Sequence, residues 1–98
     1  MKAKEYDEAI NMYSRAISLA SDEAAAYSNR ALAYLKVKNY AKCIEDADMA
    51  ISLEPDYIKA YYRRAKAYLA LNQVEAALAD FEFLRGKTQN EENINNCI

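Results

Sequence analysis

The feature that most constrains this chain is an internal repeat with a period of 34 residues. Shifting the sequence by that length superposes short matching segments, namely Ala26-Tyr27 on Ala60-Tyr61, Arg30-Ala31 on Arg64-Ala65 and Ala33-Tyr34-Leu35 on Ala67-Tyr68-Leu69. The stretch 6–19 likewise superposes on 40–53 through apolar and small residues. A fixed period of this length, with two apolar stripes in each repeat, is typical of stacked helix–turn–helix units. The repeat therefore predicts an all-α helix–turn–helix solenoid.

The composition agrees with a helical chain and argues against catalysis. One Gly and one Pro among 98 residues are too few for the turns of a β-sandwich or barrel. With no His and two Cys far apart, we expect no metal site, no cofactor and no enzyme activity, and the Cys indicate a reducing compartment. A net charge of −2 does not favour nucleic acid, and no stretch approaches the roughly 18 apolar residues of a membrane span.

Apolar periodicity and capping residues place about five helices, at residues 5–20, 23–36, 40–53, 57–71 and 74–85. Ser21-Asp22, Asn39 and Asn72 are expected to cap the helices that follow them. Pro55-Asp56 separates the third helix from the fourth.

The end of the chain is expected to differ from the rest. Gly86 is placed as the stop of the last helix, which leaves 86–98 as a polar, flexible tail. The alternative is a further helix that docks back through Ile94 and Ile98.

The repeat resembles the tetratricopeptide repeat (TPR) over residues 1–85. The family's pattern of alternating bulky and small positions is matched by Tyr27, Ala31, Tyr34, Cys43, Ala47, Ala50 and Pro55, and one repeat later by Tyr61, Ala65, Tyr68, Ala77, Phe81 and Leu84. Small residues let two helices approach closely where a large aromatic residue lies opposite. The resemblance divides the chain into a half repeat (1–23, second helix only) and two full repeats (24–57 and 58–85), and it implies that the first helix of each repeat lines a concave face.

Charge is sorted between the two kinds of helix. The first helices of the two full repeats carry six basic residues and no acid, namely Arg30, Lys36, Lys59, Arg63, Arg64 and Lys66. The second helices carry most of the acids, and Asp46 and Asp48 are expected on a solvated face away from the concave side. The concave face should therefore prefer an anionic ligand.

Two segments resemble the signature of TPR domains that hold a peptide carboxylate. Tyr27–Ala31 and Lys59–Ala65 match this carboxylate-clamp pattern, with Asn29, Lys59 and Arg63 at clamp positions and Lys36 and Lys66 placed to meet acids further back along the peptide. The TPR domain of protein serine/threonine phosphatase 5 is the most similar in these segments, followed by the chaperone-organising co-chaperones.

The resemblance implies a ligand as well as a site. Such domains bind the C-terminal Glu-Glu-Val-Asp of the 70 and 90 kDa heat-shock chaperones, in the cytoplasm and also in the nucleus. Two further clamp residues of the family belong to the first helix of the first repeat, which residues 1–98 do not include. Three of the five clamp positions are therefore expected here.

Two other functions stay open at this point. The first is a self-associating TPR scaffold without a peptide ligand, in which the unpaired first helix uses an exposed side with Ile10 and Tyr13. The second is a regulatory domain of a larger enzyme such as a phosphatase. Cys43, at a small-residue position between helices, is expected to be a buried, inert thiol.

Overall fold

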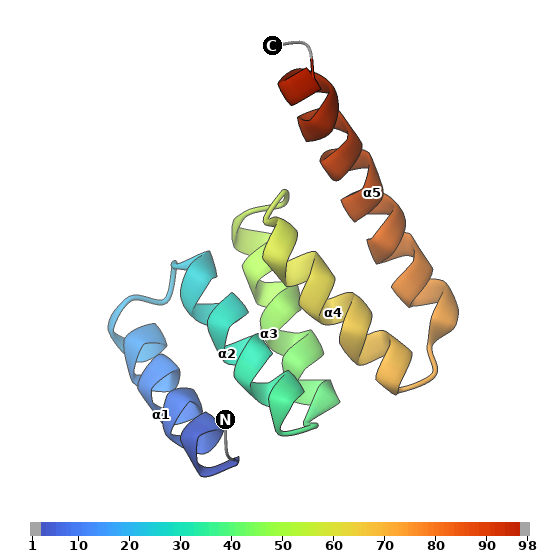
Figure 1. The fold of residues 1–98 in the computed structure, drawn as a ribbon. Helices are drawn as coiled ribbons and strands as arrows, with labels where there is room; N and C mark the ends of the chain where they lie inside the picture. Colours follow the sequence, from blue (N-terminus) through green and yellow to red (C-terminus); the bar gives the residue numbers. More distant parts are fainter. Residues whose placement is uncertain (1–2, 97–98) are drawn as a thin grey trace.

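The chain folds as a row of antiparallel helices (Figure 1). The computed structural model describes the backbone of residues 3–96 and the side chains of residues 5–87. Within that part of the chain there are five helices and no strand: α1 (Ala3–Leu19), α2 (Ala24–Lys36), α3 (Tyr40–Leu53), α4 (Ile58–Ala70) and α5 (Val74–Asn96). The predicted all-α class is confirmed. No helix in this described part is both long and apolar enough to cross a membrane.

The helices form two layers that curve. Each helix packs against the next one along the chain, and α2 also packs against α4. In the described residues α1, α3 and α5 make no comparable contact with one another. Since α2 and α4 approach each other and the other three do not, α2 and α4 lie on the inner, concave side of the solenoid.

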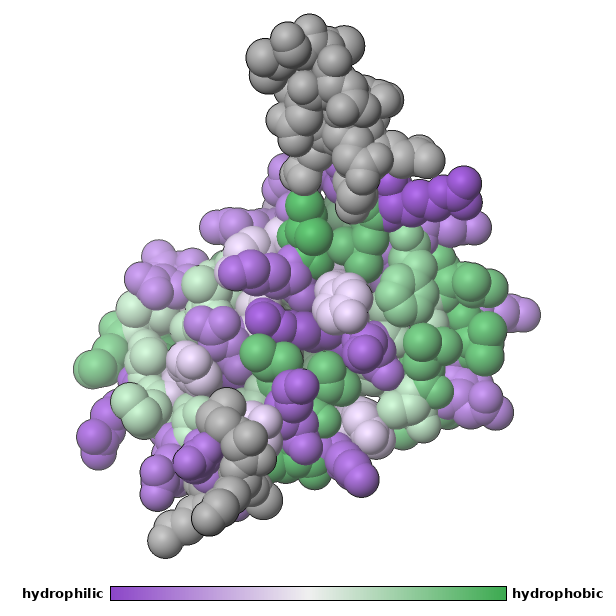
Figure 2. Space-filling model, in the orientation of Figure 1, coloured by the Kyte–Doolittle hydropathy of each residue, from purple (hydrophilic) through white to green (hydrophobic). Residues whose placement is uncertain are grey.

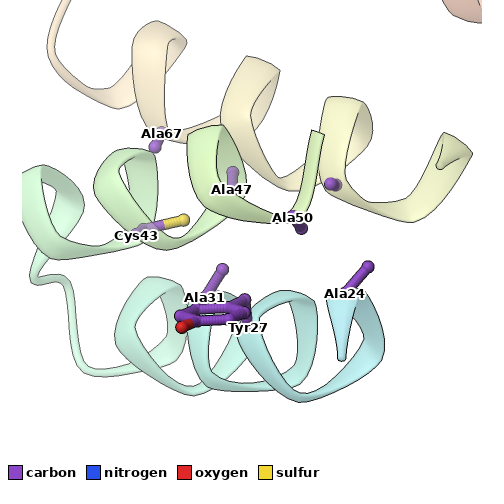
Figure 3. Packing of buried hydrophobic residues seen from close by; sticks show 8 residues of the cluster. Ala24, Tyr27, Ala31, Cys43, Ala47, Ala50 and Ala67 are labelled. Carbon is purple, nitrogen blue, oxygen red and sulfur yellow. The ribbon is translucent and has the colours of Figure 1, made fainter. Parts of the chain in front are cut away.

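Small residues hold the layers close together. The central cluster consists of one aromatic residue among small ones, namely Ala24, Tyr27, Ala31, Cys43, Ala47, Ala50, Ala60 and Ala67. Figure 3 shows Tyr27 and Ala31 on α2 facing Cys43, Ala47 and Ala50 on α3. Close packing of this kind leaves no room for a larger side chain at the alanines.

An arginine on α2 joins three helices. Arg30 donates from Nε and Nη2 to the two carboxylate oxygens of Asp46 on α3, both at 2.7 Å, and from Nη1 to Ser14 Oγ on α1 at 3.0 Å. Its guanidinium also lies 5.9 Å from the ring centroids of Tyr27 and Tyr34. The hydrogen bonds to Asp46 raise the pKa of Arg30. We call Arg30, Asp46 and Ser14 the Arg30 bridge.

The same arrangement recurs 34 residues later. Arg64 on α4 donates to both oxygens of Asp80 on α5, at 2.9 and 2.6 Å, and from Nη1 to Asp48 Oδ1 on α3 at 2.8 Å. The hydrogen bonds to Asp80, first among several causes, raise the pKa of Arg64. Arg64, Asp80 and Asp48 form the Arg64 bridge. Because Asp46 is only 5% exposed and Asp48 is ion-paired, the expectation of a solvated acidic face is wrong.

The helix starts agree with the sequence in part. Asn39 caps α3, since its Oδ1 accepts the backbone N–H of Lys42 at 3.4 Å. The N-cap of α2 is Glu23, which makes no side-chain cap bond, so the capping role predicted for Ser21 and Asp22 is wrong. The side chain of Ser21 or Asp22 is not needed there because the chain already turns at Glu23 in an extended conformation.

The helix ends of α2 and α4 repeat each other. Lys38 (φ 67°) and Asn72 (φ 62°) are in the left-handed region. In both turns this residue and its successor donate their backbone N–H groups to carbonyls of the preceding helix, at 2.8–3.1 Å. Asn72 therefore ends α4 and does not cap α5, where Gln73 accepts the first helical bond from Ala77.

The expected stop at Gly86 is also wrong. α5 continues through Gly86 to Asn96 as one helix (Figure 1), so residues 86–96 form no separate returning helix, and Ile98 lies outside the described residues. Gly86 does not have a positive φ, so it does not form the left-handed cap that its sequence position suggested. No Pro follows it, and a single Gly lowers helix stability without ending the helix.

Replacing Gly86 with Ala tests this helix directly. A Cβ at Gly86 would meet no atom within 4 Å, and Ala favours a helix interior over Gly by about 0.5–1 kcal/mol. We expect Gly86→Ala to raise the free energy of unfolding by about that amount in urea titrations, with a gain in helical circular dichroism. If Gly86 instead ended the helix with positive φ, the same change would destabilise the protein.

The two acids of α3 should differ sharply on substitution. Asp46→Asn leaves a buried arginine without its carboxylate and should cost about 3 kcal/mol. Asp48, whose side chain is 53% exposed, should cost less than about 1 kcal/mol as Asn. Urea unfolding of the two single variants measures the difference. Equal losses would contradict the assignment of Asp46 as the buried partner of Arg30.

Candidate functional site

The basic residues of the concave layer fall into two groups. Arg30 and Arg64 are neutralised by the bridges described above. Arg63, by contrast, has no carboxylate partner among the described residues, and neither do Lys36, Lys59 and Lys66. The free positive charge of the concave face therefore comes from these four side chains.

Arg63 is held by the neighbouring repeat. Its Nη1 donates to the backbone oxygen of Ser28 on α2 at 3.0 Å and to Ser28 Oγ. Ser28 is fully buried, so these bonds fix the guanidinium across the contact between α2 and α4. Burial lowers the pKa of Arg63 from its ordinary value. This is the mark of a half-buried cation whose desolvation no acid offsets.

Two of the predicted residues share a pocket. A pocket of about 320 Å³ is lined by Lys59, Arg63, Ile58, Tyr62 and Leu84. Its apolar side comes from α4 and α5, and the Tyr62 residue is 50% exposed. The pocket thus places a basic edge beside an apolar wall, a combination suited to a ligand with an anionic group next to an apolar one.

The other predicted residues lie around this pocket. Asn29 follows Ser28 on α2 and is half-buried, while Lys36 and Lys66 are exposed and do not line the pocket. Lys66 Nζ lies 5.6 Å from the ring centroid of Tyr62. The structure thus brings Arg63 and Lys59 together and leaves the two outer lysines on the surface.

Sequence reasoning missed three residues of this region. Ser28 supports Arg63, and Tyr62 and Leu84 form the apolar wall. Tyr62 had a visible signal, since it lies between the two predicted basic residues at a position one repeat after Ser28. The role of Ser28 required the register between α2 and α4, which the sequence pattern alone does not supply.

The thiol of Cys43 agrees with its expected role. It is fully buried and donates from Sγ to the backbone oxygen of Arg63 at 3.6 Å. Burial raises its pKa to about 12, so it is protonated at neutral pH and a poor nucleophile.

The open side of α1 is not the predicted one. Ile10 and Tyr13 are half-buried, so the expectation that they form an exposed side is wrong. A pocket of about 450 Å³ lies instead on the opposite face, lined by Asn11, Met12, Arg15, Ala16 and Leu19.

Hydrophilic and hydrophobic side chains separate on the face seen in Figure 2. Hydrophilic side chains cross the middle of this face, over α2 and α4, and hydrophobic ones gather over the α4–α5 turn on the right. The exposed apolar residues at this turn are Leu71, Val74 and Leu78. The free charge of the concave layer is thus distinct from the apolar end of the solenoid.

Comparison with known proteins begins with the repeats themselves. A TPR repeat model matches residues 1–38, and tetratricopeptide repeat models match residues 24–57 and 47–79. These matches start at or near the repeats read from the sequence. No curated protein matches the chain significantly.

Solved structures give longer alignments. The second TPR of Spaghetti (RPAP3) bound to the HSP90 peptide SRMEEVD is 38% identical, with 81% of this chain and 73% of that chain covered and a TM-score of 0.79. The TPR2B domain of yeast Sti1 in complex with an Hsp70 peptide is 31% identical, covers 92% and 72%, and has a TM-score of 0.85. The second TPR domain of human RPAP3 in complex with the HSP70 peptide SGPTIEEVD is 37% identical, covers 83% and 68%, and has a TM-score of 0.79. The likeness to phosphatase 5 stays a prediction, and the chain belongs to the tetratricopeptide repeat family.

Proposed function

We propose that this chain is a protein-interaction module that binds acidic C-terminal peptides in its concave face, with Asn29, Lys59 and Arg63 at the carboxylate. The partners we propose are the Glu-Glu-Val-Asp tails of the 70 and 90 kDa heat-shock chaperones, which implies a cytoplasmic site of action. Whether the module also serves a larger enzyme, such as a phosphatase, stays a prediction.

The observation that supports this function most is the state of Arg63. A guanidinium that is half-buried and has no acid partner in the described residues is electrostatically unsatisfied. A carboxylate placed on its free N–H groups would remove that penalty through charge-assisted hydrogen bonds. Because Ser28 holds Nη1, the group meets such a ligand with little loss of conformational freedom.

The surroundings of Arg63 suit the end of an acidic peptide. Lys59 lies one helical turn before Arg63 and lines the same pocket, so it supplies a second, movable charge for the same carboxylate. Asn29 supplies a neutral donor from α2, and the wall of Ile58, Tyr62 and Leu84 suits an apolar side chain next to the terminal residue. Lys36 and Lys66 are exposed and should attract acids further along the peptide only weakly.

The related structures support the same ligand class. RPAP3 domains are described with peptides ending in Glu-Glu-Val-Asp from both HSP90 and HSP70, and the yeast Sti1 domain is described with an Hsp70 peptide. A second candidate is self-association, which the open pocket on α1 favours. Analytical ultracentrifugation with and without peptide separates the two functions.

Arg63 should matter more than Lys66 for peptide binding. A pentapeptide ending in Glu-Glu-Val-Asp should bind weakly, with a dissociation constant near ~1 mM, since three of the five clamp positions are present. Arg63→Ala should weaken it at least tenfold, because Arg63 meets the terminal carboxylate, while exposed Lys66→Ala should change it less than threefold, both by roughly the energies of charged hydrogen bonds and surface pairs. Isothermal titration or NMR titration, repeated at higher salt, measures both.

The amidated pentapeptide is the control for that experiment. Amidation removes the terminal charge and should abolish the difference between the parent and Arg63→Ala. If the amidated peptide binds as well as the acid, the clamp assignment is wrong.

Ser28→Ala tests whether the orientation of Arg63 matters. The variant keeps the backbone acceptor but loses Oγ, so Arg63 should sample more rotamers and affinity should fall about threefold to tenfold, roughly the worth of one hydrogen bond. The exposed Ser52 on α3 provides a matched control as Ser52→Ala. A loss of affinity in both variants, or in neither, would contradict the positioning role of Ser28.

A further inference from the structure

The two arginine bridges match atom for atom except at one position. Each arginine binds an aspartate 16 residues ahead through Nε and Nη2, and a side chain 16 residues behind through Nη1. In the Arg64 bridge the residue behind is Asp48, at 2.8 Å, and in the Arg30 bridge it is Ser14, at 3.0 Å. Ser14 therefore holds the place of a carboxylate.

This difference leaves the Arg30 bridge with one anion fewer. Arg64 is paired with two carboxylates, whereas Arg30 is paired with Asp46 and a neutral hydroxyl. The Arg64 bridge shows that a second anion is compatible with the first, because Asp48 and Asp80 bind the same guanidinium together. A hydrogen bond to a charged partner is roughly twice as strong as one between a charged and a neutral group of the same geometry would suggest for a neutral pair.

The position also has room for a larger group. Ser14 is half-buried, and the side chain of Asp48 at the equivalent place is 53% exposed. Oxygens that do not reach the guanidinium would therefore remain in water, where they cost little.

We propose that Ser14 is a phosphorylation site and that the phosphate, bound to Arg30, holds α1 against α2. In the reaction Ser14 Oγ attacks the γ-phosphorus of ATP bound to a protein kinase, the bond from that phosphorus to the ADP oxygen breaks, and the hydroxyl proton passes to a carboxylate base of the kinase. The product carries about two negative charges at neutral pH and three acceptor oxygens. It supplies the Arg30 bridge with the anion that Asp48 supplies to Arg64.

The packing of α1 makes this serine accessible to a kinase. Within the described residues α1 packs only against α2, and its other face is open, with Met12 72% and Leu19 83% exposed. A terminal helix with one partner separates from the fold more easily than an internal helix with two. Ser14 is therefore reachable in the undocked state, and its modification favours the docked state.

The test compares phosphoserine at two positions of the same helix. Ser18 lies one turn after Ser14, is exposed, and makes no side-chain hydrogen bond in the described part of the chain, so phosphoserine at 18 is the matched control. Phosphoserine at 14 should slow amide hydrogen exchange across α1 about tenfold relative to the unmodified protein and raise the melting temperature. Phosphoserine at 18 should do neither. Slower exchange at both positions, or faster exchange at 14, would overturn the proposal.

Two simpler variants test the equivalence with the second bridge. Ser14→Asp should protect α1 in the same direction as phosphoserine, and Asp48→Ser should reduce protection of α3 and α4 by a comparable factor. Phosphopeptide mapping of the protein isolated from its own cells should then find phosphate on Ser14. Its absence under all growth conditions tested would overturn the assignment as a modification site.

Discussion

The solenoid depends on a charged hydrogen bond placed inside a layer of alanines. Small residues let α2 approach α3, and α4 approach α5, closely enough that only a long, planar side chain fits between them. Arg30 and Arg64 fill that space, and each can be buried only because an aspartate from the next helix meets its Nε and Nη2. Each bridge also reaches the helix before it, so the same contact sets the spacing within a repeat and between repeats.

Neighbouring arginines on α4 have opposite environments. Arg64 points into the packed layer, where hydrogen bonds to Asp80 raise its pKa, while burial without an acid lowers the pKa of Arg63. Adjacent helical residues lie about 100° apart around the axis, so one step in sequence moves a guanidinium from a satisfied site to an unsatisfied one. A count of basic residues in the helix treats the two alike, although only Arg63 is available to a ligand.

The period of 34 residues predicted the number of helices, their order and the small-residue core, because each of these follows from apolar spacing. It did not predict that α5 continues past Gly86, since helix propensity over the following residues outweighs one glycine and the local pattern shows only the glycine. It also placed Asp46 in water, because net charge per helix contains no information on which face a residue occupies. The pairing of Arg30 with Asp46 needed the register between two helices, and the support that Ser28 gives Arg63 needed the register between repeats.

That register was nevertheless partly visible in the sequence. Arg30 and Asp46 recur one period later as Arg64 and Asp80, so a charged pair that repeats with the fold is a pair that builds the fold. Residues that break the period are free of that duty: Asn29 becomes Arg63, and Ser14 becomes Asp48. The first difference leaves a cation without an acid at the concave face, and the second leaves an arginine with a hydroxyl in place of a carboxylate. In a repeat protein whose packing is periodic, the departures from the period are therefore where a ligand or a modification has most to change.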